Sequence, residues 1–291
     1  MAEKHRKQPI LIQLDTDPQP SSFDSVVAID AGVGSLLSYS QVALDQVQSL
    51  VHGAIFTRGT QDLRHTAIFI GGSDVDVGDQ ILRRVRASFL GPLSVSVMVD
   101  ANGANTTAAA AVHVANRHMN LESVRALVLA GTGPVGRRPA RLLAGRGAKV
   151  RLASRSAQRA ADAANKVNEF LGSDLIIPYA TADLGQLRAA LDDIDLVIAA
   201  GAAGIELLPA AELHDATGVK VAIDLNAVPP SGIENVKATD QAVQLGTTTV
   251  YGAVGVGITK MKIHKAAIAS LFERHDLVLD AEEIFEIACR L

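Results

Sequence analysis

Short apolar runs alternate with helix-type patterns along the chain, and this alternation limits the fold more than any other feature of the sequence. A strand, a helix and a second strand of the same sheet give parallel pairing with a right-handed crossover. The patterns therefore predict an α/β protein with parallel sheets. Strands are expected over residues 9–14, 66–70, 93–99, 124–130, 149–153, 175–177, 196–199, 219–224 and 249–254. Helices are expected over residues 23–33, 42–52, 76–89, 105–119, 259–272 and 280–291.

The 291 residues are enough for two domains. We expect an N-terminal α/β substrate domain over residues 1–121 and a Rossmann-type doubly wound domain over residues 122–258. The helix expected over residues 105–119 would cross their boundary, and an active-site cleft would lie between the domains. The last segment, residues 259–291, is expected to pack back toward the N-terminal domain.

Composition and charge exclude several classes of function. The net charge is −4 and aromatic residues make up 3% of the chain, which argues against nucleic-acid binding. Cys289 is the only cysteine, so a disulfide within the chain and a cysteine-based zinc site are both excluded, and no metal is expected. No apolar stretch approaches the ~20 residues of a membrane-spanning helix, and no signal-type segment follows the charged N-terminus. A cytoplasmic protein without a membrane partner is expected.

The most informative motif is a glycine-rich turn between an apolar run and a helical pattern. Its GxGxxG spacing is followed by another apolar run at the distance expected for a strand–helix–strand unit. Such glycines allow a tight turn, close approach of the backbone to a pyrophosphate, and close helix packing. A glycine-rich turn without a ligand is the alternative, and Pro139 would remove one hydrogen bond early in the helix. The predicted cofactor contacts of this loop are Gly131, Thr132, Gly133, Pro134, Val135 and Gly136.

The end of the next strand predicts which dinucleotide binds. NAD-binding proteins usually have an acidic residue there, which binds the ribose 2′-hydroxyl. This chain has Ser154, Arg155, Ser156 and Arg159, and no acid before Asp162. Guanidinium and hydroxyl groups suit a 2′-phosphate, so NADP is the expected cofactor and NAD is the alternative. The segment could instead be a solvated basic loop that binds no cofactor. Small residues after a later strand are expected to contact the cofactor too: Ala200, Gly201 and Ala202.

Several segments together resemble one enzyme family. They are DTDPQPSSFDSVVAIDAG near the N-terminus, DANGANTTAAA at 100–110, AGTGPVG at 130–136, DLNAVPPSGI at 224–233 and the C-terminal GAVGVGITKMKIHKAAIASLFE. They resemble bacterial NAD(P)-dependent methylenetetrahydromethanopterin dehydrogenases of one-carbon metabolism, over nearly the whole chain. The resemblance implies an N-terminal α/β domain followed by a Rossmann domain, as in the wider methylenetetrahydrofolate dehydrogenase fold.

The resemblance also implies a reaction. A hydride would pass from the methylene carbon of methylenetetrahydromethanopterin to the nicotinamide, giving a methenyl cation, with methylenetetrahydrofolate as the alternative substrate. No proton leaves in that step, so orientation and electrostatics matter more than a strong base. Lys260 matches the family's active-site lysine and is the expected catalytic residue, whereas Lys262 is less favoured. A surface lysine at a helix start is the alternative interpretation of Lys260.

A pterin needs carboxylate or amide partners for its amino-pyrimidinone edge and an apolar surface for its ring. Asp17 and Asp24 could supply the edge and Phe23 the apolar surface, although a first-turn carboxylate and a core aromatic are ordinary alternatives. Further residues could cap the helix expected over residues 105–119 or contact the substrate: Asn102, Thr106 and Thr107.

Asn226 follows the predicted strand 219–224 and precedes a double proline, which would hold a rigid loop beside the nicotinamide. It could bond the carboxamide of the cofactor.

Two other functions fit part of the sequence. A shikimate-dehydrogenase-like NADP oxidoreductase would explain the SRSAQR loop, although the N-terminal half lacks a clear Lys/Asp pair where that enzyme needs it. A catalytically silent NADP-binding protein would keep the cofactor loops without hydride transfer. Assembly into a homo-oligomer is expected from the resemblance.

Overall fold

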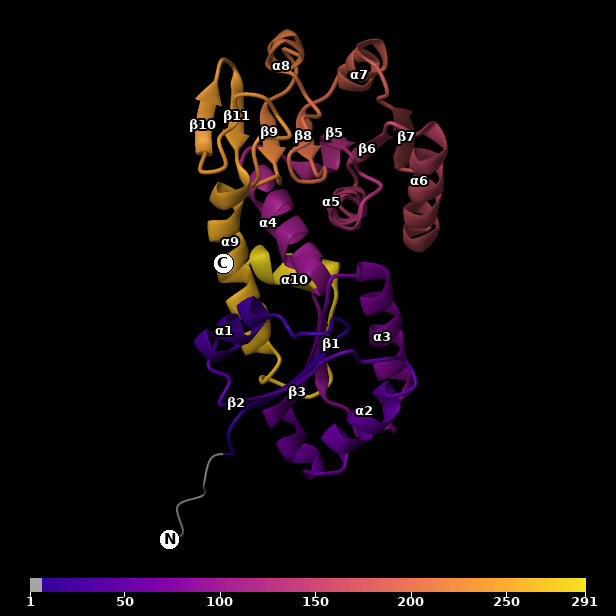
Figure 1. The fold of residues 1–291 in the computed structure, drawn as a ribbon, viewed down its shortest axis with the longest axis vertical. Coiled ribbons are helices and arrows are strands. Elements are labelled where there is room, and N and C mark those ends of the chain that lie inside the picture. The colour runs from indigo at the N-terminus through magenta and orange to yellow at the C-terminus, as the bar shows by residue number, and fades with distance from the viewer. Residues whose placement is uncertain (1–6) are drawn as a thin grey trace. The chain divides into compact units, whose positions relative to one another are not determined.

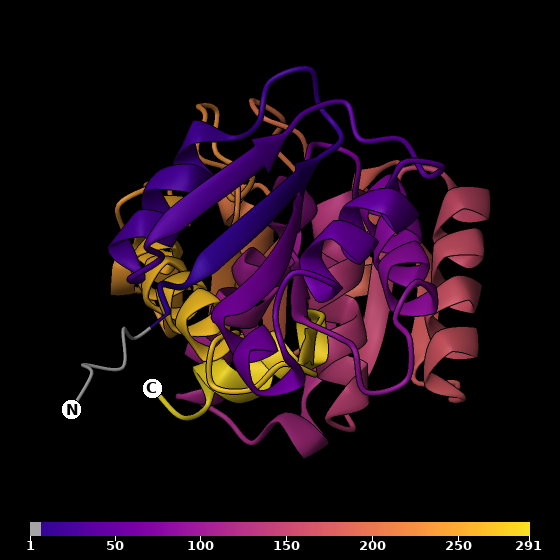
Figure 2. The same cartoon turned by 90° about the horizontal axis from the view of Figure 1, so that it is seen from below.

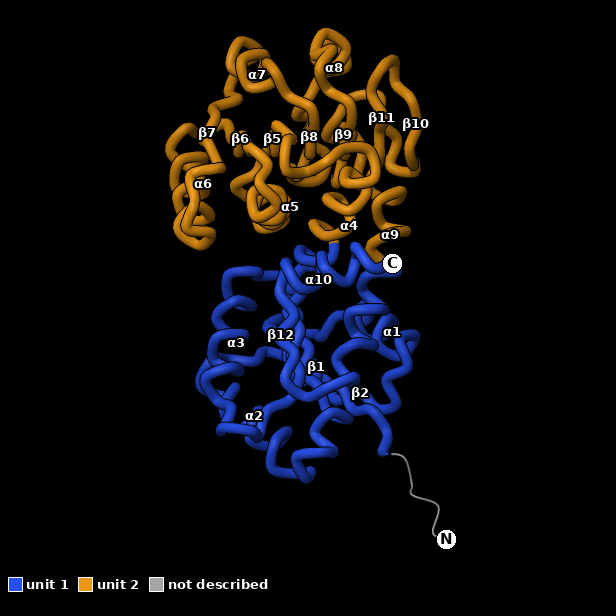
Figure 3. The backbone as a smooth tube through the Cα atoms, turned by 180° about the vertical axis from the view of Figure 1, so that it is seen from behind, with its two compact units in different colours: residues 1–106, 261–291 blue, residues 107–260 orange. Residues whose placement is uncertain are grey.

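The computed structural model describes residues 7–291, which divide into two units (Figure 3). Unit 1 comprises the described residues up to 106 together with residues 261–291, and unit 2 comprises residues 107–260. The chain passes from one unit to the other inside helices α4 (Ala104–Asn116) and α9 (Ala253–Ser270). The sequence patterns put these boundaries after residues 121 and 258 instead.

Within the described residues, unit 1 is built on a five-stranded parallel sheet in the order β2-β1-β3-β4-β12. Figure 1 labels β1, β2 and β3 of this sheet, and Figure 2 shows the same ribbon from below. Its strands are β1 (Ile10–Asp15), β2 (Ser35–Tyr39), β3 (Thr66–Gly71), β4 (Ser96–Val99) and β12 (Val278–Leu279). Its helices are α1 (Ser22–Asp30), α2 (Val47–Ile55), α3 (Val75–Ala87) and α10 (Ala281–Ala288), with short 3-10 helices η1 (Thr60–His65) and η2 (Ala101–Gly103). Fully buried aliphatic side chains such as Val51 of α2, Ile70 of β3 and Ile81 of α3 form its core. Because the strands are parallel, the loops after β1, β3 and β4 meet at one edge of this sheet.

Residues 107–260, all of which the structure describes, form a seven-stranded sheet in the order β10-β11-β9-β8-β5-β6-β7. Its strands are β5 (Arg125–Leu129), β6 (Lys149–Ser154), β7 (Ile176–Ala180), β8 (Leu196–Ala199), β9 (Val221–Asp224), β10 (Gln241–Leu245) and β11 (Thr248–Tyr251). Its helices include η3 (Leu121–Ser123), α5 (Pro134–Gly145), α6 (Ala157–Leu171), α7 (Leu184–Leu191) and α8 (Ala210–Asp215). Every neighbouring pair is parallel except β10 with β11. The strand order reverses between β5 and β8, which is the switch point of a doubly wound sheet. The predicted fold class, two α/β domains of which the second is Rossmann-type, is confirmed.

Several elements differ from those predicted. The strands β2, β10 and β12 were not predicted, because β2 and β10 are largely exposed edge strands without a clear apolar pattern and β12 has only two residues. Helix α9 begins at Ala253, although the sequence predicts a strand up to residue 254 and a helix start at residue 259. The glycines of GAVGVG lower helix propensity, so the sequence pattern does not predict the first turns of α9. Pro139 lies inside α5 and is buried there, so packing offsets the hydrogen bond that its ring removes.

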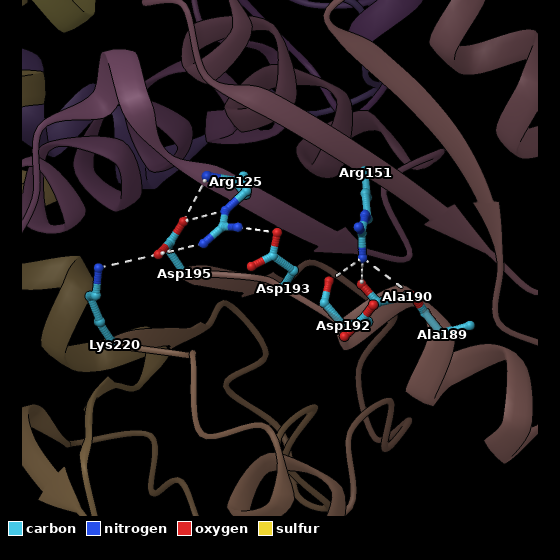
Figure 4. A network of polar contacts seen from close by, with 8 residues as sticks. All are labelled: Arg125, Arg151, Ala189, Ala190, Asp192, Asp193, Asp195 and Lys220. Atoms are coloured by element: carbon cyan, nitrogen blue, oxygen red, sulfur yellow. Dashed lines mark hydrogen bonds and ion pairs between the residues drawn. The ribbon is translucent and has the colours of Figure 1, made fainter.

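A network of charged side chains ties the strands of unit 2 together at their amino-terminal ends (Figure 4). Arg125 at the start of β5 donates from Nε to Asp195 Oδ2 at 3.0 Å and also pairs with Asp193. Lys220, just before β9, reaches Asp195 Oδ1 at 3.2 Å. Burial of Asp195 alone would raise its pKa, but the hydrogen bonds from Arg125 and Lys220 outweigh it and hold the pKa below its usual value. The network lies at the edge of the sheet opposite the glycine-rich loop.

No helix among residues 7–291 is both long and apolar enough to cross a membrane. In the same described residues, no three His, Cys, Asp or Glu side chains come together as a metal site.

Candidate functional site

The glycine-rich loop joins β5 to α5 at the switch point of unit 2. Its own packing requires two of the glycines: a Cβ on Gly131 would lie 2.8 Å from Leu152 Cγ, and a Cβ on Gly136 would lie 2.8 Å from Gly131 Cα. A Cβ on Gly133 would come no closer to the protein than 3.7 Å, at the Ala130 carbonyl oxygen. Gly133 is the N-cap of α5, where free N–H groups and the helix dipole favour an anion. The loop therefore forms a cradle whose open side is at Gly133.

A cavity of about 480 Å³ lies at the carboxyl ends of β5, β6, β7 and β8. Half of the predicted cofactor-binding residues line it: Thr132, Ser154, Arg155, Ser156, Arg159, Gly201 and Ala202. The others do not line it: Gly131, Gly133, Pro134, Val135, Gly136, Ala200 and Asn226. The cavity thus brings the glycine-rich loop, the loop after β6 and the turn after β8 into one space.

The loop after β6 contributes the positive charge of this cavity. Arg155 and Arg159 are exposed, and among residues 7–291 neither guanidinium takes part in a hydrogen bond or an ion pair. Ser154 is buried and its Oγ accepts the Ser156 N–H at 3.3 Å. Ser156 in turn caps α6, because its Oγ accepts the Arg159 N–H at 3.3 Å. The two serines hold the loop so that both guanidinium groups can meet an anionic ligand.

Two further groups of lining residues were missed by the sequence analysis. Thr181, Asp183 and Leu184 follow β7, and Ile205 and Leu207 follow β8. Neither group carries a motif. The topology of the sheet could have predicted the first group. The carboxyl ends of neighbouring parallel strands lie at the same edge, and β7 pairs with β6, so the residues after β7 lie beside those after β6.

Asn226 belongs to a loop that is held together from inside. Its Oδ1 accepts the Val228 N–H at 3.0 Å and its Nδ2 donates to the Pro230 carbonyl oxygen at 3.1 Å. Asp224 at the end of β9 accepts N–H groups from Asn226 and Ile233 at 3.0 and 3.1 Å. Burial raises the pKa of Asp224 although these backbone hydrogen bonds favour its ionised form. Both ends of the Asn226 amide are thus used in shaping the loop, and its contact with a cofactor stays a prediction.

In unit 1, the loop after β1 carries the first predicted substrate residues. Asp15, which is 1% exposed, accepts the N–H groups of Asp17 and Ser21 at 2.9 and 3.1 Å and so fixes the loop. Asp17 accepts a hydrogen bond from Ser73 Oγ at 2.8 Å, which joins this loop to the one after β3. Asn102 is exposed after β4, where its N–H donates to the Gly72 carbonyl oxygen. The structure brings Asp17 and Asn102 to the same edge of the sheet.

An aromatic cluster at the start of α1 joins side chains from α1, α9 and β3. Phe23 is 48% exposed, and its ring centroid is 6.2 Å from that of His264, which belongs to α9 and is fully buried. The His264 ring stacks on Phe69 of β3 at 5.8 Å, and its Nε2 lies 4.0 Å from Asp24 Oδ1. Phe23 and Asp24 therefore sit together, over a histidine that the sequence analysis did not select. Because more than 200 residues separate α1 from α9, the sequence gives no sign that His264 lies beside Phe23 and Asp24.

The residues at the start of α4 mainly organise the backbone. Thr106 is fully buried and its Oγ1 donates to Asp100 Oδ2 at 2.6 Å. Asp100 also accepts the N–H groups of Asn105 and Thr106 at 2.9 and 3.0 Å. Thr106 thus holds the start of α4, whereas Thr107 is half-buried and Asn102 is exposed; contact of the three residues with a substrate stays a prediction.

Lys260 lies within α9, about two turns after Ala253, and not at a helix start as the sequence pattern predicts. Its side chain is half-buried, whereas Lys262 is exposed. Two residues rotate a helix by about 200°, so the two lysines point in different directions.

Comparison with known proteins identifies relatives along nearly the whole chain. A family model for the N-terminal part of methylene-tetrahydromethanopterin dehydrogenase matches residues 22–102. The protein named bifunctional protein MdtA, from Methylorubrum extorquens, is 42% identical over 281 residues, which cover 96% of this chain and 97% of that protein. An NAD(P)-dependent methylenetetrahydromethanopterin dehydrogenase from the same organism is 32% identical over 281 residues, covering 93% of this chain and 94% of that protein.

A solved structure provides an independent comparison of the fold. Shikimate 5-dehydrogenase from Listeria monocytogenes, in complex with shikimate and NAD, has a TM-score of 0.53 with 13% identity, and 96% of each chain is covered. At that identity the likeness describes the fold alone and says nothing about the substrate.

Proposed function

Because this chain belongs to the family of NAD(P)-dependent methylenetetrahydromethanopterin dehydrogenases, we propose that it transfers a hydride from the methylene carbon of methylenetetrahydromethanopterin to NADP. The product is a methenyl cation stabilised by the two nitrogens beside that carbon. The observation that carries the proposal is the cavity of unit 2, which joins the glycine-rich loop to Arg155 and Arg159 and has no acid at the end of β6.

The residues of the cavity fit a dinucleotide phosphate. The pyrophosphate would lie on the open side of the glycine-rich loop at Gly133, against the first N–H groups of α5. Arg155 and Arg159 would bind the 2′-phosphate, and the Ser156 hydroxyl can still donate a hydrogen bond while its oxygen caps α6. NAD lacks the 2′-phosphate, so it would bind more weakly.

When bound, NADP would supply the hydride acceptor at its nicotinamide ring, and the protein would have to hold the donor carbon at the right distance and angle. No proton leaves the methylene carbon in this step, so no general base is required. We assign the catalytic position to Lys260, whose ammonium group can donate hydrogen bonds that orient the pterin. Lys262 is exposed and is not assigned a role.

We assign pterin binding to the carboxyl edge of the unit 1 sheet. The carboxylates of Asp17 and Asp24 can accept N–H groups from the amino-pyrimidinone edge, and the half-exposed ring of Phe23 offers an apolar surface. Asn102 and Thr107 are further candidates for polar contacts.

The proposal is tested by following NADPH formation by absorbance with three substrates under the same cofactor concentration. Turnover of methylenetetrahydromethanopterin supports it, and comparison with methylenetetrahydrofolate identifies the preferred carrier. Turnover of shikimate alone would instead favour the shikimate-type alternative, and NADP binding without turnover of any substrate would favour a catalytically silent NADP-binding protein.

Assembly into a homo-oligomer remains part of the proposal. Light scattering of the purified protein tests it directly, and the mass of a single chain at micromolar concentration would contradict it.

A further inference from the structure

Asp183 is a carboxylate at the wall of the cavity whose position is fixed by its neighbours. It is the N-cap of α7, and its Oδ1 accepts the Gln186 N–H at 2.9 Å. Gln186 holds the same turn from the other side, because its Oε1 accepts the Ala182 N–H at 2.9 Å. Among residues 7–291, no other hydrogen bond or ion pair involves the Asp183 side chain. Its second oxygen, Oδ2, is therefore an acceptor available to a ligand in the cavity.

The sheet register places Asp183 beside the residues that would bind the 2′-phosphate. Ser154 at the end of β6 pairs with Ala180 at the end of β7, and the Thr181 N–H donates to the Ser154 carbonyl oxygen at 2.9 Å. The segment after β7 thus leaves the sheet next to the loop that carries Arg155. The base of a dinucleotide is attached to the same ribose as its 2′-phosphate. A phosphate at Arg155 therefore requires the base to occupy a neighbouring part of the cavity.

The cavity near Asp183 has the chemistry of a site for a purine. Apolar side chains from α7 and from the segment after β8, among them Leu184, Leu187 and Leu207, line it and suit the faces of a flat ring. An ionised carboxylate has no proton to donate and can only accept hydrogen bonds. The edge of the ring that meets Asp183 must therefore carry a donor, and the 6-amino group of adenine is one.

We propose that Asp183 Oδ2 accepts a hydrogen bond from the 6-amino group of adenine, and that this contact selects adenine dinucleotides over those with a 6-oxo purine. The proposal rests on the proposed function, because it takes the ligand of the cavity to be NADP. A 6-oxo base would present a carbonyl oxygen to the carboxylate, and two acceptors facing each other repel. Asp183 thus determines specificity at the base, while Arg155 and Arg159 act at the 2′-phosphate.

Asp183→Asn tests the contact without removing the helix cap. Asparagine is as good an N-cap as aspartate, so its side-chain oxygen can keep the Gln186 N–H, while an NH2 group replaces Oδ2. We measure the dissociation constants of NADP and of nicotinamide hypoxanthine dinucleotide phosphate by calorimetry, with the melting temperature as a check of folding. The wild-type protein should bind NADP about 10-fold to 100-fold more tightly than the hypoxanthine analogue, as expected for a hydrogen bond to a charged group. In Asp183→Asn this ratio should fall to about 1 or reverse, because the NH2 group can donate to the 6-oxo group.

Two further variants separate the contact from general effects. Asp74→Asn makes the same change at the N-cap of α3, where Asp74 Oδ1 accepts the Val77 N–H at 3.0 Å, and should leave the ratio at its wild-type value. Asp183→Ser keeps a capping oxygen but has no second acceptor, so it should lower the ratio toward 1 without reversing it, even if the asparagine variant folds poorly.

The outcomes distinguish the proposal from the function on which it rests. The proposed adenine contact would be wrong if the ratio of the dissociation constants of NADP and the hypoxanthine analogue were unchanged in both Asp183 variants. It would also be wrong if the wild-type protein bound the two nucleotides equally well. Either result would leave NADP binding itself intact. A change in the NADP-to-NAD ratio without a change in the adenine-to-hypoxanthine ratio would also overturn it, because Asp183 would then act at the ribose. Failure of the wild-type protein to bind either nucleotide would contradict the proposed function itself.

Discussion

Replacement of Arg155 by glutamate isolates the contact that distinguishes NADP from NAD. Arg155 is exposed at the wall of the cavity, and its guanidinium has no hydrogen bond or ion pair among residues 7–291. The substitution therefore breaks no contact inside the described protein. A loss of affinity in Arg155→Glu would belong to the ligand, with little change in the melting temperature.

The expected loss follows from the charge and the exposure of the site. A hydrogen bond between charged groups contributes about 1.5–3 kcal/mol. Repulsion between the new carboxylate and the phosphate adds about 1 kcal/mol for each pair of unit charges 4 Å apart in water. The two contributions add to about 2.5–4 kcal/mol without screening. Solvent and salt weaken both at an exposed position, so we expect a smaller loss, about 2 kcal/mol or roughly 30-fold in the dissociation constant. NAD has no 2′-phosphate and should change by less than about threefold.

The assay is a calorimetric titration of each variant with NADP and with NAD at two salt concentrations. Arg83→Glu is the matched control, because Arg83 is an exposed arginine of α3 that lies outside the cavity. It should leave both dissociation constants unchanged. Equal losses of NADP and NAD affinity in Arg155→Glu, or a loss in neither, would refute the assignment of Arg155 to the 2′-phosphate.

Three other predictions follow from the structure. Lys260→Ala should lower kcat about 100-fold through lost orientation, with an almost unchanged NADP dissociation constant, whereas Lys262→Ala should keep most activity in the same steady-state assay. Gly133→Ala should fold normally, because its Cβ would meet no protein atom closer than 3.7 Å, but should bind NADP poorly, because the Cβ would occupy the space proposed for the pyrophosphate. Gly136→Ala should lower the melting temperature through its clash with the loop backbone. Hydrogen bonds from Arg125 and Lys220 outweigh burial and lower the pKa of Asp195 in the folded protein. The ionised Asp195 therefore stabilises the folded protein at a pH above the pKa that it has in the unfolded chain. This stabilisation is lost as the pH falls through the pKa of the folded state. Asp195→Asn should therefore cost about 1–2 kcal/mol in urea unfolding at pH 7, and a difference that persists undiminished at pH 3 would contradict this account.

Local spacing in the sequence was sufficient to predict that the glycine-rich loop and the SRSAQR loop lie at one edge of the unit 2 sheet, whereas their contacts with a cofactor stay a prediction. The glycine-rich loop and the SRSAQR loop each lie within a few residues of a strand end, so position along the chain determines their place at the switch point. The predicted family is also confirmed by the two relatives from Methylorubrum extorquens.

Contacts between distant segments could not be predicted from spacing. Asp183 follows a strand with no motif, and only the pairing of β6 with β7 brings it to the cavity. His264 comes from the C-terminal segment and meets Phe23 and Asp24 only through the packing of α9 in unit 1. Asn226 was selected for its polar side chain, and the hydrogen bonds that its amide makes within the loop could not be predicted from spacing; its contact with a cofactor stays a prediction.

The central claim is that the hydride moves from the methylene carbon to NADP, and isotopic labelling of that carbon tests it most directly. We would incubate the enzyme and NADP with methylenetetrahydromethanopterin in which both hydrogens of the methylene carbon are replaced by deuterium. The products would be analysed by NMR and mass spectrometry. The account predicts one deuterium at the nicotinamide C4 of each NADPH formed, with the other retained in an equal amount of the methenyl product. NADPH without deuterium, or no NADPH although the protein binds both ligands, would contradict it.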